Sequence, residues 1–252
     1  MKKQSKPLLV MLHGFRGSGE GLGLLARELD ADFEILRPDL PGSGSSAELE
    51  RQNLEGFVEW LHEYITALPK KPVLAMHSMG AIVGSHYLEK YPKDVQSRVI
   101  LMSPIICNVG GKILNRALYG IATVGLAPFS ERYKLKIWAS PKISGMISWF
   151  LVRDRSRREF VFAENQRCSG KTASTRSLFA DMKLATRTET TLAFEKKMLV
   201  IVGRGDRLAS RRLVRERANL AGAKYEELVG AGHLINYERP EEVAKLIREF
   251  LC

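Results

Sequence analysis

Short apolar runs alternate with amphipathic stretches along most of this chain. Residues 54–68 repeat apolar side chains at the spacing of a helical turn, whereas the run Leu8–Leu12 is apolar throughout. Such alternation is typical of βαβ units, in which helices connect parallel strands. We therefore predict an α/β fold with a mostly parallel sheet of about six or more strands, flanked by helices.

The expected elements can be placed along the chain. The predicted strands are Leu8–Leu12, Phe33–Arg37, Val73–His77, Val99–Met102, Met198–Val202 and Lys224–Val229. The predicted helices are Gly23–Leu29, Leu54–Leu68, Ala81–Lys90, Arg211–Ala221 and Pro240–Phe250. The last of these starts with proline, which suits a first turn because an N–H there would have no helical partner.

The alternation fails between about residues 105 and 191, where no strand rhythm is visible. Strand alternation resumes directly afterwards, so we interpret this stretch as a helical insertion in a single core. The predicted organisation is a core of residues 1–104 and 192–252, with residues 105–191 forming a helical, basic insertion.

Positive charge is concentrated in this insertion. The chain has a net charge of +11, and residues 105–189 hold 15 Lys and Arg against 6 Asp and Glu, which gives +9. A basic excess can indicate nucleic acid, anionic lipid or an acidic substrate, but it also marks an ordinary solvated helix surface. No helix-turn-helix, zinc-finger spacing or aromatic RNA-binding motif is present, so we expect no nucleic-acid partner.

Candidate chemistry gathers at the ends of three predicted strands. Ser78 follows the third strand at a sharp turn into a helix, Asp206 follows the fifth and His233 follows the sixth. The carboxyl ends of parallel strands share one edge of a sheet, so we expect the three side chains to meet there. Asp206 could instead be an N-cap or a turn former before the helix expected from Arg211.

These residue types suit nucleophilic catalysis. His233 would take the proton of Ser78 and return it to the leaving group, and Asp206 would fix the histidine tautomer. A developing oxyanion needs backbone donors, for which we nominate the amides of Phe15 and Met79. Glycines beside Phe15, among them Gly14, would let that loop approach closely.

At these positions the chain resembles the α/β-hydrolase fold superfamily of serine hydrolases. The matching motifs are His13-Gly-Phe15, Arg37-Pro-Asp-Leu-Pro-Gly-Ser-Gly-Ser45, His77-Ser-Met-Gly80, Gly203-Arg-Gly-Asp206 and Gly232-His233 followed by Tyr237-Glu-Arg-Pro-Glu-Glu-Val243. The resemblance implies a triad of Ser78, Asp206 and His233, with oxyanion donors at Phe15 and Met79. It also implies that the insertion is a helical cap over the active site.

The chain departs from the family pattern at the nucleophile turn. The family usually has Gly-x-Ser-x-Gly, in which a small residue lets the strand and the following helix cross closely. Here Met76 stands at the first small position, so we expect a wider crossing or an adjusted neighbour. Gly80, Ala81 and Gly84 keep the helix side small.

Substrate contacts are expected from both the core and the cap. The candidates are His13, Gly14 and Trp149, and His13 is also expected to shape the oxyanion loop. In the cap an apolar stretch, 146–152, precedes a basic cluster, 153–158. This pair of segments is open to three interpretations: a helix buried on the core, an acyl tunnel beside a lipid surface, or a pocket arginine that holds a substrate carboxylate.

Composition sets the remaining expectations. Cys107, Cys168 and Cys252 lack the spacing of a metal site or disulfide framework, and no apolar run is long enough to span a membrane. We therefore expect reduced thiols and a soluble, cytoplasmic protein, with no metal and no organic cofactor. Peripheral contact with anionic lipid through the basic cap is expected as a partner interaction, and the oligomeric state is left open.

The sequence as a whole predicts a serine hydrolase that cleaves a small to medium, lipophilic carboxylic ester through an acyl-enzyme. One alternative keeps the fold and triad but acts on an acidic substrate as a carbon–carbon hydrolase, lyase or peptidase. Another is a ligand-binding or receptor module without turnover.

Overall fold

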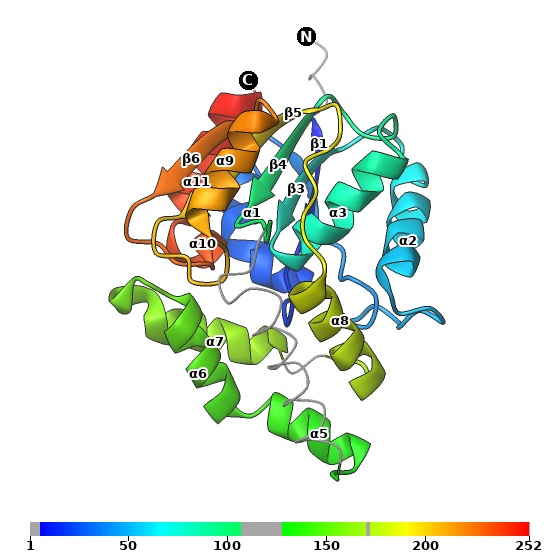
Figure 1. Ribbon diagram of the computed structural model, residues 1–252, viewed down its shortest axis with the longest axis vertical. Helices are drawn as coiled ribbons and strands as arrows, with labels where there is room; N and C mark the ends of the chain where they lie inside the picture. Colours follow the sequence, from blue (N-terminus) through cyan, green and yellow to red (C-terminus); the bar gives the residue numbers. More distant parts are fainter. Residues whose placement is uncertain (1–5, 107–127, 170–171, 252) are drawn as a thin grey trace.

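Six parallel strands form the centre of the molecule. The structure, a computed structural model, describes residues 6–106, 128–169 and 172–251. Within these residues the sheet order is β2-β1-β3-β4-β5-β6, and every neighbouring pair is parallel. The strands are β1 (Leu8–Leu12), β2 (Glu34–Leu36), β3 (Val73–His77), β4 (Arg98–Met102), β5 (Lys197–Gly203) and β6 (Lys224–Leu228) (Figure 1). The predicted α/β fold is confirmed.

Helices cover both faces of this sheet because the central strands are apolar on both sides. Along β1, Val10 and Leu12 pack on one face, whereas Leu9 and Met11 pack on the other. The first face is covered by α2 (Leu54–Thr66), α3 (Met79–Lys90) and α9 (Arg211–Leu220). The second is covered by α1 (Gly23–Leu29) and α11 (Pro240–Leu251).

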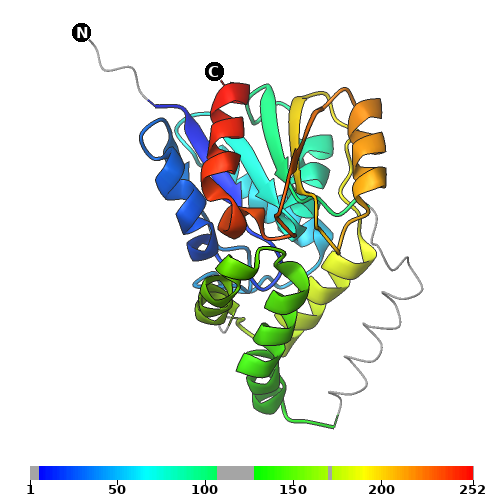
Figure 2. The same cartoon turned by 90° about the vertical axis from the view of Figure 1, so that its left-hand side faces the viewer.

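The described residues between β4 and β5 form a group of helices. They are α5 (Glu131–Trp138), α6 (Pro141–Leu151), the short 3-10 turn η2 (Arg155–Arg157), α7 (Arg158–Ser169) and α8 (Thr175–Arg187). Figures 1 and 2 show α5, α6 and α7 together at the end of the molecule opposite the two termini. Helix α8 reaches the core, because Leu184 and Ala185 join the cluster on the α3 face.

This arrangement agrees with a helical insertion, while the boundaries 1–104, 105–191 and 192–252 stay predictions. Cys107 and Cys252 lie outside the described residues. None of the described helices has both the length and the apolar character required to cross a membrane.

Two further short elements complete the edge of the sheet that faces the insertion. The 3-10 helix η1 (Gly19–Leu22) follows the loop after β1, and α10 (Ile235–Glu238) follows the loop after β6. Both loops contain candidate site residues.

Candidate active site

Ser78 occupies a strained turn between β3 and α3. Its backbone has φ 53° and ψ −114°, in the left-handed half of conformational space that side chains rarely adopt. Helix α3 starts immediately at Met79 and passes very close to the end of β1. A Cβ added to Gly80 would lie 2.6 Å from the His13 carbonyl oxygen, so the turn requires a glycine there.

Met76, the departure from the usual motif, is accommodated by the same helix. A Cβ added to Gly84 would lie 2.2 Å from the Met76 sulfur. Because Gly84 has no side chain, it leaves room for Met76, which stands where the family usually has a small residue. The adjusted neighbour expected from the sequence is this glycine, one turn further along α3.

The structure brings together the three side chains predicted to form a triad. The Ser78 Oγ lies 2.8 Å from His233 Nε2, and His233 Nδ1 lies 2.8 Å from Asp206 Oδ2. Because an ionised carboxylate only accepts hydrogen bonds, Nδ1 is the protonated nitrogen and Nε2 is free to accept from the serine hydroxyl. The three side chains thus form one continuous hydrogen-bonded chain.

Asp206 is buried and held as an anion. Burial by itself would raise the pKa of its carboxyl, but the adjacent His233 and the amides of Leu208 and Ala209, which donate to the same carboxylate, lower the pKa overall. Ser210, and not Asp206, occupies the N-cap position of α9. Asp206 does form the turn before that helix, because its Oδ1 accepts from the Leu208 and Ala209 amides.

The loop after β1 lies directly against the nucleophile. A Cβ on Gly14 would lie 2.9 Å from the Ser78 Cβ, and the amide of Gly17 donates to the Gly14 carbonyl to close a tight turn. Among the described residues, neither the Phe15 amide nor the Met79 amide donates a hydrogen bond to another group. Both remain free to act as oxyanion donors, which stays a prediction.

His13 is engaged entirely with the main chain. Its Nε2 accepts from the Leu40 amide at 2.9 Å, and its Nδ1 lies 2.9 Å from the Gly14 carbonyl oxygen, to which it donates. Burial lowers the pKa of this ring and keeps it neutral. Main-chain hydrogen bonds thus hold His13 in the loop after β1, and both its role in shaping an oxyanion loop and its contact with substrate stay predictions.

His77 was not among the predicted site residues. Its Nε2 donates to the main-chain carbonyl of His233 at 3.1 Å. Burial, together with the neighbouring His233, lowers the pKa of His77 to about 3, so the ring stays neutral. This hydrogen bond holds the backbone of His233 from the buried side of the site. The apolar pattern of the strand around His77 gives no sign of this contact.

Comparisons with known proteins identify the family of this chain. A family model described as the alpha/beta hydrolase family matches residues 9–246. The chain belongs to the α/β-hydrolase family. Monoacylglycerol lipase ABHD6 from Homo sapiens is 27% identical over 265 residues, which cover 98% of this chain and 76% of that protein.

Solved structures of esterases and lactonases share the fold of this α/β-hydrolase. A thermophilic esterase from Thermogutta terrifontis superposes with a TM-score of 0.77 at 22% identity, covering 98% of this chain and 90% of its own. The enol-lactonase from Burkholderia xenovorans gives a TM-score of 0.76 at 20% identity, covering 100% and 93%. The prediction of an α/β-hydrolase is confirmed, and the relatives that the chain resembles are named as lipases and esterases.

A buried arginine links the loop after β1 of this hydrolase to the insertion. Arg16 has φ 61°, and its guanidinium donates to the Trp138 carbonyl at 3.1 Å and to Ser144 Oγ at 2.8 Å. The same group lies 4.6 Å from the centre of the Trp138 ring. Burial lowers the pKa of Arg16 to about 10, so it remains charged, although no described carboxylate pairs with it.

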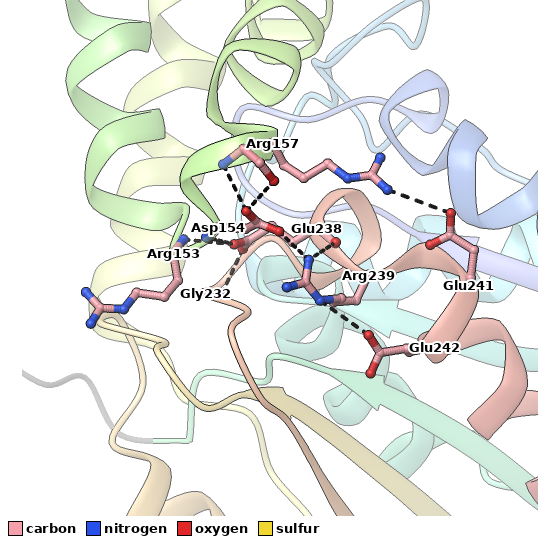
Figure 3. Close-up of polar contacts among 9 residues, drawn as sticks. Arg153, Asp154, Arg157, Gly232, Glu238, Arg239, Glu241 and Glu242 are labelled. Carbon is pink, nitrogen blue, oxygen red and sulfur yellow. Dashed lines mark hydrogen bonds and ion pairs between the residues drawn. The ribbon is translucent and has the colours of Figure 1, made fainter.

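A buried carboxylate makes the second link. Glu238 accepts from the amide of Gly232 through Oε1 at 2.8 Å, and from the amides of Arg153 and Asp154 through Oε2 at 2.8 and 2.9 Å (Figure 3). The His233 amide also donates to the Leu151 carbonyl. Burial raises the pKa of Glu238, although the three amides oppose this effect. The loop that carries His233 is therefore fixed to the end of α6.

The sequence indicated these two residues to different degrees. Glu238 falls within a motif that supported the family resemblance, but nothing in the motif told which groups it would bind. Arg16 is an ordinary polar loop residue by composition, and only its burial distinguishes it.

Trp149, the predicted substrate contact from the insertion, lies on α6 with 58% of its surface exposed. The Arg207 guanidinium lies 5.6 Å from its ring centre. Trp149 thus lies at the surface, and its contact with substrate stays a prediction. No cluster of three or more potential metal ligands occurs among the described residues.

Proposed function

We propose that this α/β-hydrolase cleaves a lipophilic carboxylic ester with a small to medium acyl group through an acyl-enzyme. The observation that carries the proposal is the chain of two 2.8 Å contacts from Ser78 through His233 to Asp206. The positive φ of Ser78 adds support, because it holds the hydroxyl at the tip of a sharp turn.

In the proposed reaction, Ser78 Oγ bonds to the ester carbonyl carbon while His233 Nε2 takes the hydroxyl proton. The amides of Phe15 and Met79 would hold the oxyanion of the tetrahedral intermediate. When the carbon–oxygen bond to the alcohol breaks, His233 returns the proton to the leaving alcohol. Water then attacks the acyl-enzyme by the same route and releases the carboxylic acid, which restores Ser78.

The lipophilic preference rests on the insertion and on the relatives. Exposed large apolar side chains gather in the insertion, where Phe129, Tyr133, Met146, Trp149, Phe150 and Phe160 are each at least 39% exposed. Relatives named as lipases and esterases act on esters. The cytoplasmic location and the independence from a cofactor stay predictions of the sequence.

A specific observation favours an acidic substrate as the second candidate. Arg16 is buried beside the proposed oxyanion donor Phe15 and lacks a carboxylate partner among the described residues. A buried guanidinium is costly when unpaired, so a substrate carboxylate would offset that cost. Comparing a neutral ester with its carboxylate-bearing analogue tests this: Arg16→Met should weaken turnover of the charged ester selectively.

Covalent labelling with a fluorophosphonate tests the main proposal. We expect labelling of the wild type and none of Ser78→Ala. Ser103→Ala is a matched control, since Ser103 is also buried, has φ 46° and follows the neighbouring strand β4, and this variant should still be labelled. A folded wild type that resists labelling would exclude the mechanism and favour a binding module without turnover. Nitrophenyl esters of increasing chain length would then define the acyl preference.

A further inference from the structure

Three arginines line a surface hollow beside the candidate active site. The hollow has a volume of about 440 Å³ and is bounded by Arg153, Arg204 and Arg207 together with Gly205, Asp206 and Gly230. Asp206 contributes no accessible charge to it, because its side chain is only 1% exposed and is bonded to His233. The hollow is therefore strongly positive.

One of these arginines, Arg153, belongs to the insertion. The Arg153 amide is held by the buried Glu238, and Figure 3 shows the Arg153 side chain turned away from that carboxylate. The stem of the side chain packs on Gly205, where an added Cβ would lie 2.7 Å from Arg153 Cγ. The hollow thus combines a charge from the insertion with two from the loop around Asp206.

None of the three guanidinium groups forms an ion pair with any carboxylate of the described chain. Nearby arginines differ in this respect. Arg239 pairs with Asp154 and Glu242, and Arg215 pairs with Glu227. Guanidinium groups are suited to phosphate oxygens because their N–H groups form a planar fork. Three unpaired forks around one hollow fit a phosphate ligand.

Exposed aromatic rings border the hollow. The Arg207 guanidinium lies 5.6 Å from the Trp149 ring centre and 5.9 Å from that of Phe150. Met146, Trp149 and Phe150 share one face of α6, at helical spacing, and are 60%, 58% and 41% exposed. Apolar and aromatic side chains beside basic groups are the combination that binds at the surface of an anionic bilayer.

We propose that this arginine hollow binds the phosphate of an anionic lipid at a membrane surface, with Trp149 and Phe150 entering the interface beside it. The inference goes beyond the proposed hydrolysis and does not depend on it. It gives the junction between the insertion and the core a role in membrane docking. In this role, the edge of the sheet that carries the candidate active site would face the lipid.

Vesicle binding by the full chain carrying Ser78→Ala tests the proposal without turnover. We expect that protein to sediment with vesicles of phosphatidylcholine and phosphatidylglycerol in equal amounts, more strongly at low salt, and weakly with phosphatidylcholine alone. Adding Arg204→Gln and Arg207→Gln should weaken binding about 25-fold, since each basic residue near an anionic surface contributes about fivefold.

A matched control removes the same charge elsewhere. Lys71→Gln/Lys93→Gln alters exposed lysines that precede β3 and β4 at the opposite edge of the sheet, and binding should change less than about twofold. Equal losses in both double variants, or no preference for phosphatidylglycerol, would overturn the proposal. Displacement by an equal concentration of free glycerol 3-phosphate would also overturn it, because the ligand would then be a soluble phosphate ester.

A second measurement covers the case in which the arginine variant does not fold. Insertion of Trp149 should shift tryptophan emission to shorter wavelength when anionic vesicles are added, and Trp149→Phe should abolish the shift while retaining sedimentation. An unchanged emission spectrum in the Ser78→Ala protein bound to vesicles would contradict the proposed orientation.

Discussion

Helices α3 and α6 bury opposite kinds of side chain. In the core, α3 buries nine of its residues, including Ile82, Val83, Tyr87 and Leu88. In the insertion, α6 buries only Ser144 and Ser148 and exposes Met146, Trp149 and Phe150. Apolar burial is the main source of folding free energy, so the two helices are held in place by different forces.

The difference shows how the insertion is attached. Helices α5 and α6 themselves bury almost no apolar residue. Polar contacts join them and the segment after α6 to the loops beside Ser78 and His233, from Arg16 to Trp138 and Ser144 and from Glu238 to Arg153 and Asp154. Among the described residues, apolar contact with these loops is limited to the Phe15 and Trp138 rings and a small cluster of Leu151 and Val152 with Leu234 and Tyr237. Regions with few buried apolar contacts open at lower free-energy cost than a core. We therefore expect α5 and α6 to open without unfolding the sheet.

The largest predicted effect lies wholly in the core. His233→Ala should reduce kcat/KM by about 10⁴-fold or more, because the proton of Ser78 loses its acceptor. His86→Ala on α3 is the control and should retain activity. Met146→Ala on α6 should change kcat far less than His233→Ala. Ester turnover by folded His233→Ala at the wild-type rate would show that another group is the base.

The second prediction concerns the link between the two regions. Glu238→Gln replaces one carboxylate oxygen with a donor that faces a main-chain amide, which costs about 1–3 kcal/mol for each unsatisfied group. We expect a fall in unfolding free energy of about 3 kcal/mol and a fall in kcat of about tenfold with little change in KM. Denaturant melts and steady-state kinetics would measure both.

Glu242→Gln provides the comparison for Glu238. Glu242 is half exposed and pairs with Arg239 at 3.3 Å on the surface, where ion pairs contribute less than about 1 kcal/mol. Its loss should leave kcat unchanged. Similar kinetic effects of the two variants would mean that Glu238 does not position the His233 loop.

A pH-dependent prediction tests α8, which connects the insertion to the core. Burial raises the pKa of Asp181 to about 7, although Gln52 opposes the shift. The folded protein therefore keeps this proton up to about pH 7, whereas the unfolded chain releases it near pH 4, so stability falls as pH rises between these values. Asp181→Asn should be more stable than wild type at pH 8, on the order of 3 kcal/mol, and similar to it below pH 4.

Thermal melts across this pH range, with Asp30→Asn as an exposed control, would measure the effect. The control should follow the wild type at every pH. An Asp181→Asn protein whose advantage stays constant with pH would contradict the assigned titration.

The core of this protein could be predicted from its sequence because local pattern and burial agree there. Leu8–Leu12 and Val73–His77 are apolar strands with the bounds that the structure gives them, and their carboxyl ends place Ser78 as expected. Asp206 and His233 could be nominated because a parallel sheet forces the ends of distant strands to one edge.

The remaining site residues could not be predicted because their roles depend on contacts that the chain pattern does not encode. Glu238 binds amides about 85 residues away, at Arg153 and Asp154. For α6, the apolar residues allowed burial on the core as one interpretation. Trp149 and Phe150 are nevertheless exposed. Periodicity shows that a helix has an apolar face, but it does not show whether another element covers that face.

The smallest predicted effects compare one glycine in each helix. Gly84→Ala in α3 should destabilise the protein by about 1–3 kcal/mol, because the new Cβ would lie 2.2 Å from the Met76 sulfur in a packed core. Gly145→Ala in α6 should instead stabilise it by about 0.5–1 kcal/mol, since the nearest atom is 3.6 Å away on Phe162 and alanine is the better helix former.

Adding Met76→Ala to Gly84→Ala decides the cause of the first effect. If the two side chains compete for one space, the double variant should lose less stability than the sum of the single variants. Strict additivity would mean that the crossing of β3 and α3 tolerates Met76 by other means. A destabilising Gly145→Ala would show that α6 is packed as tightly as α3, which would break the contrast between the two helices.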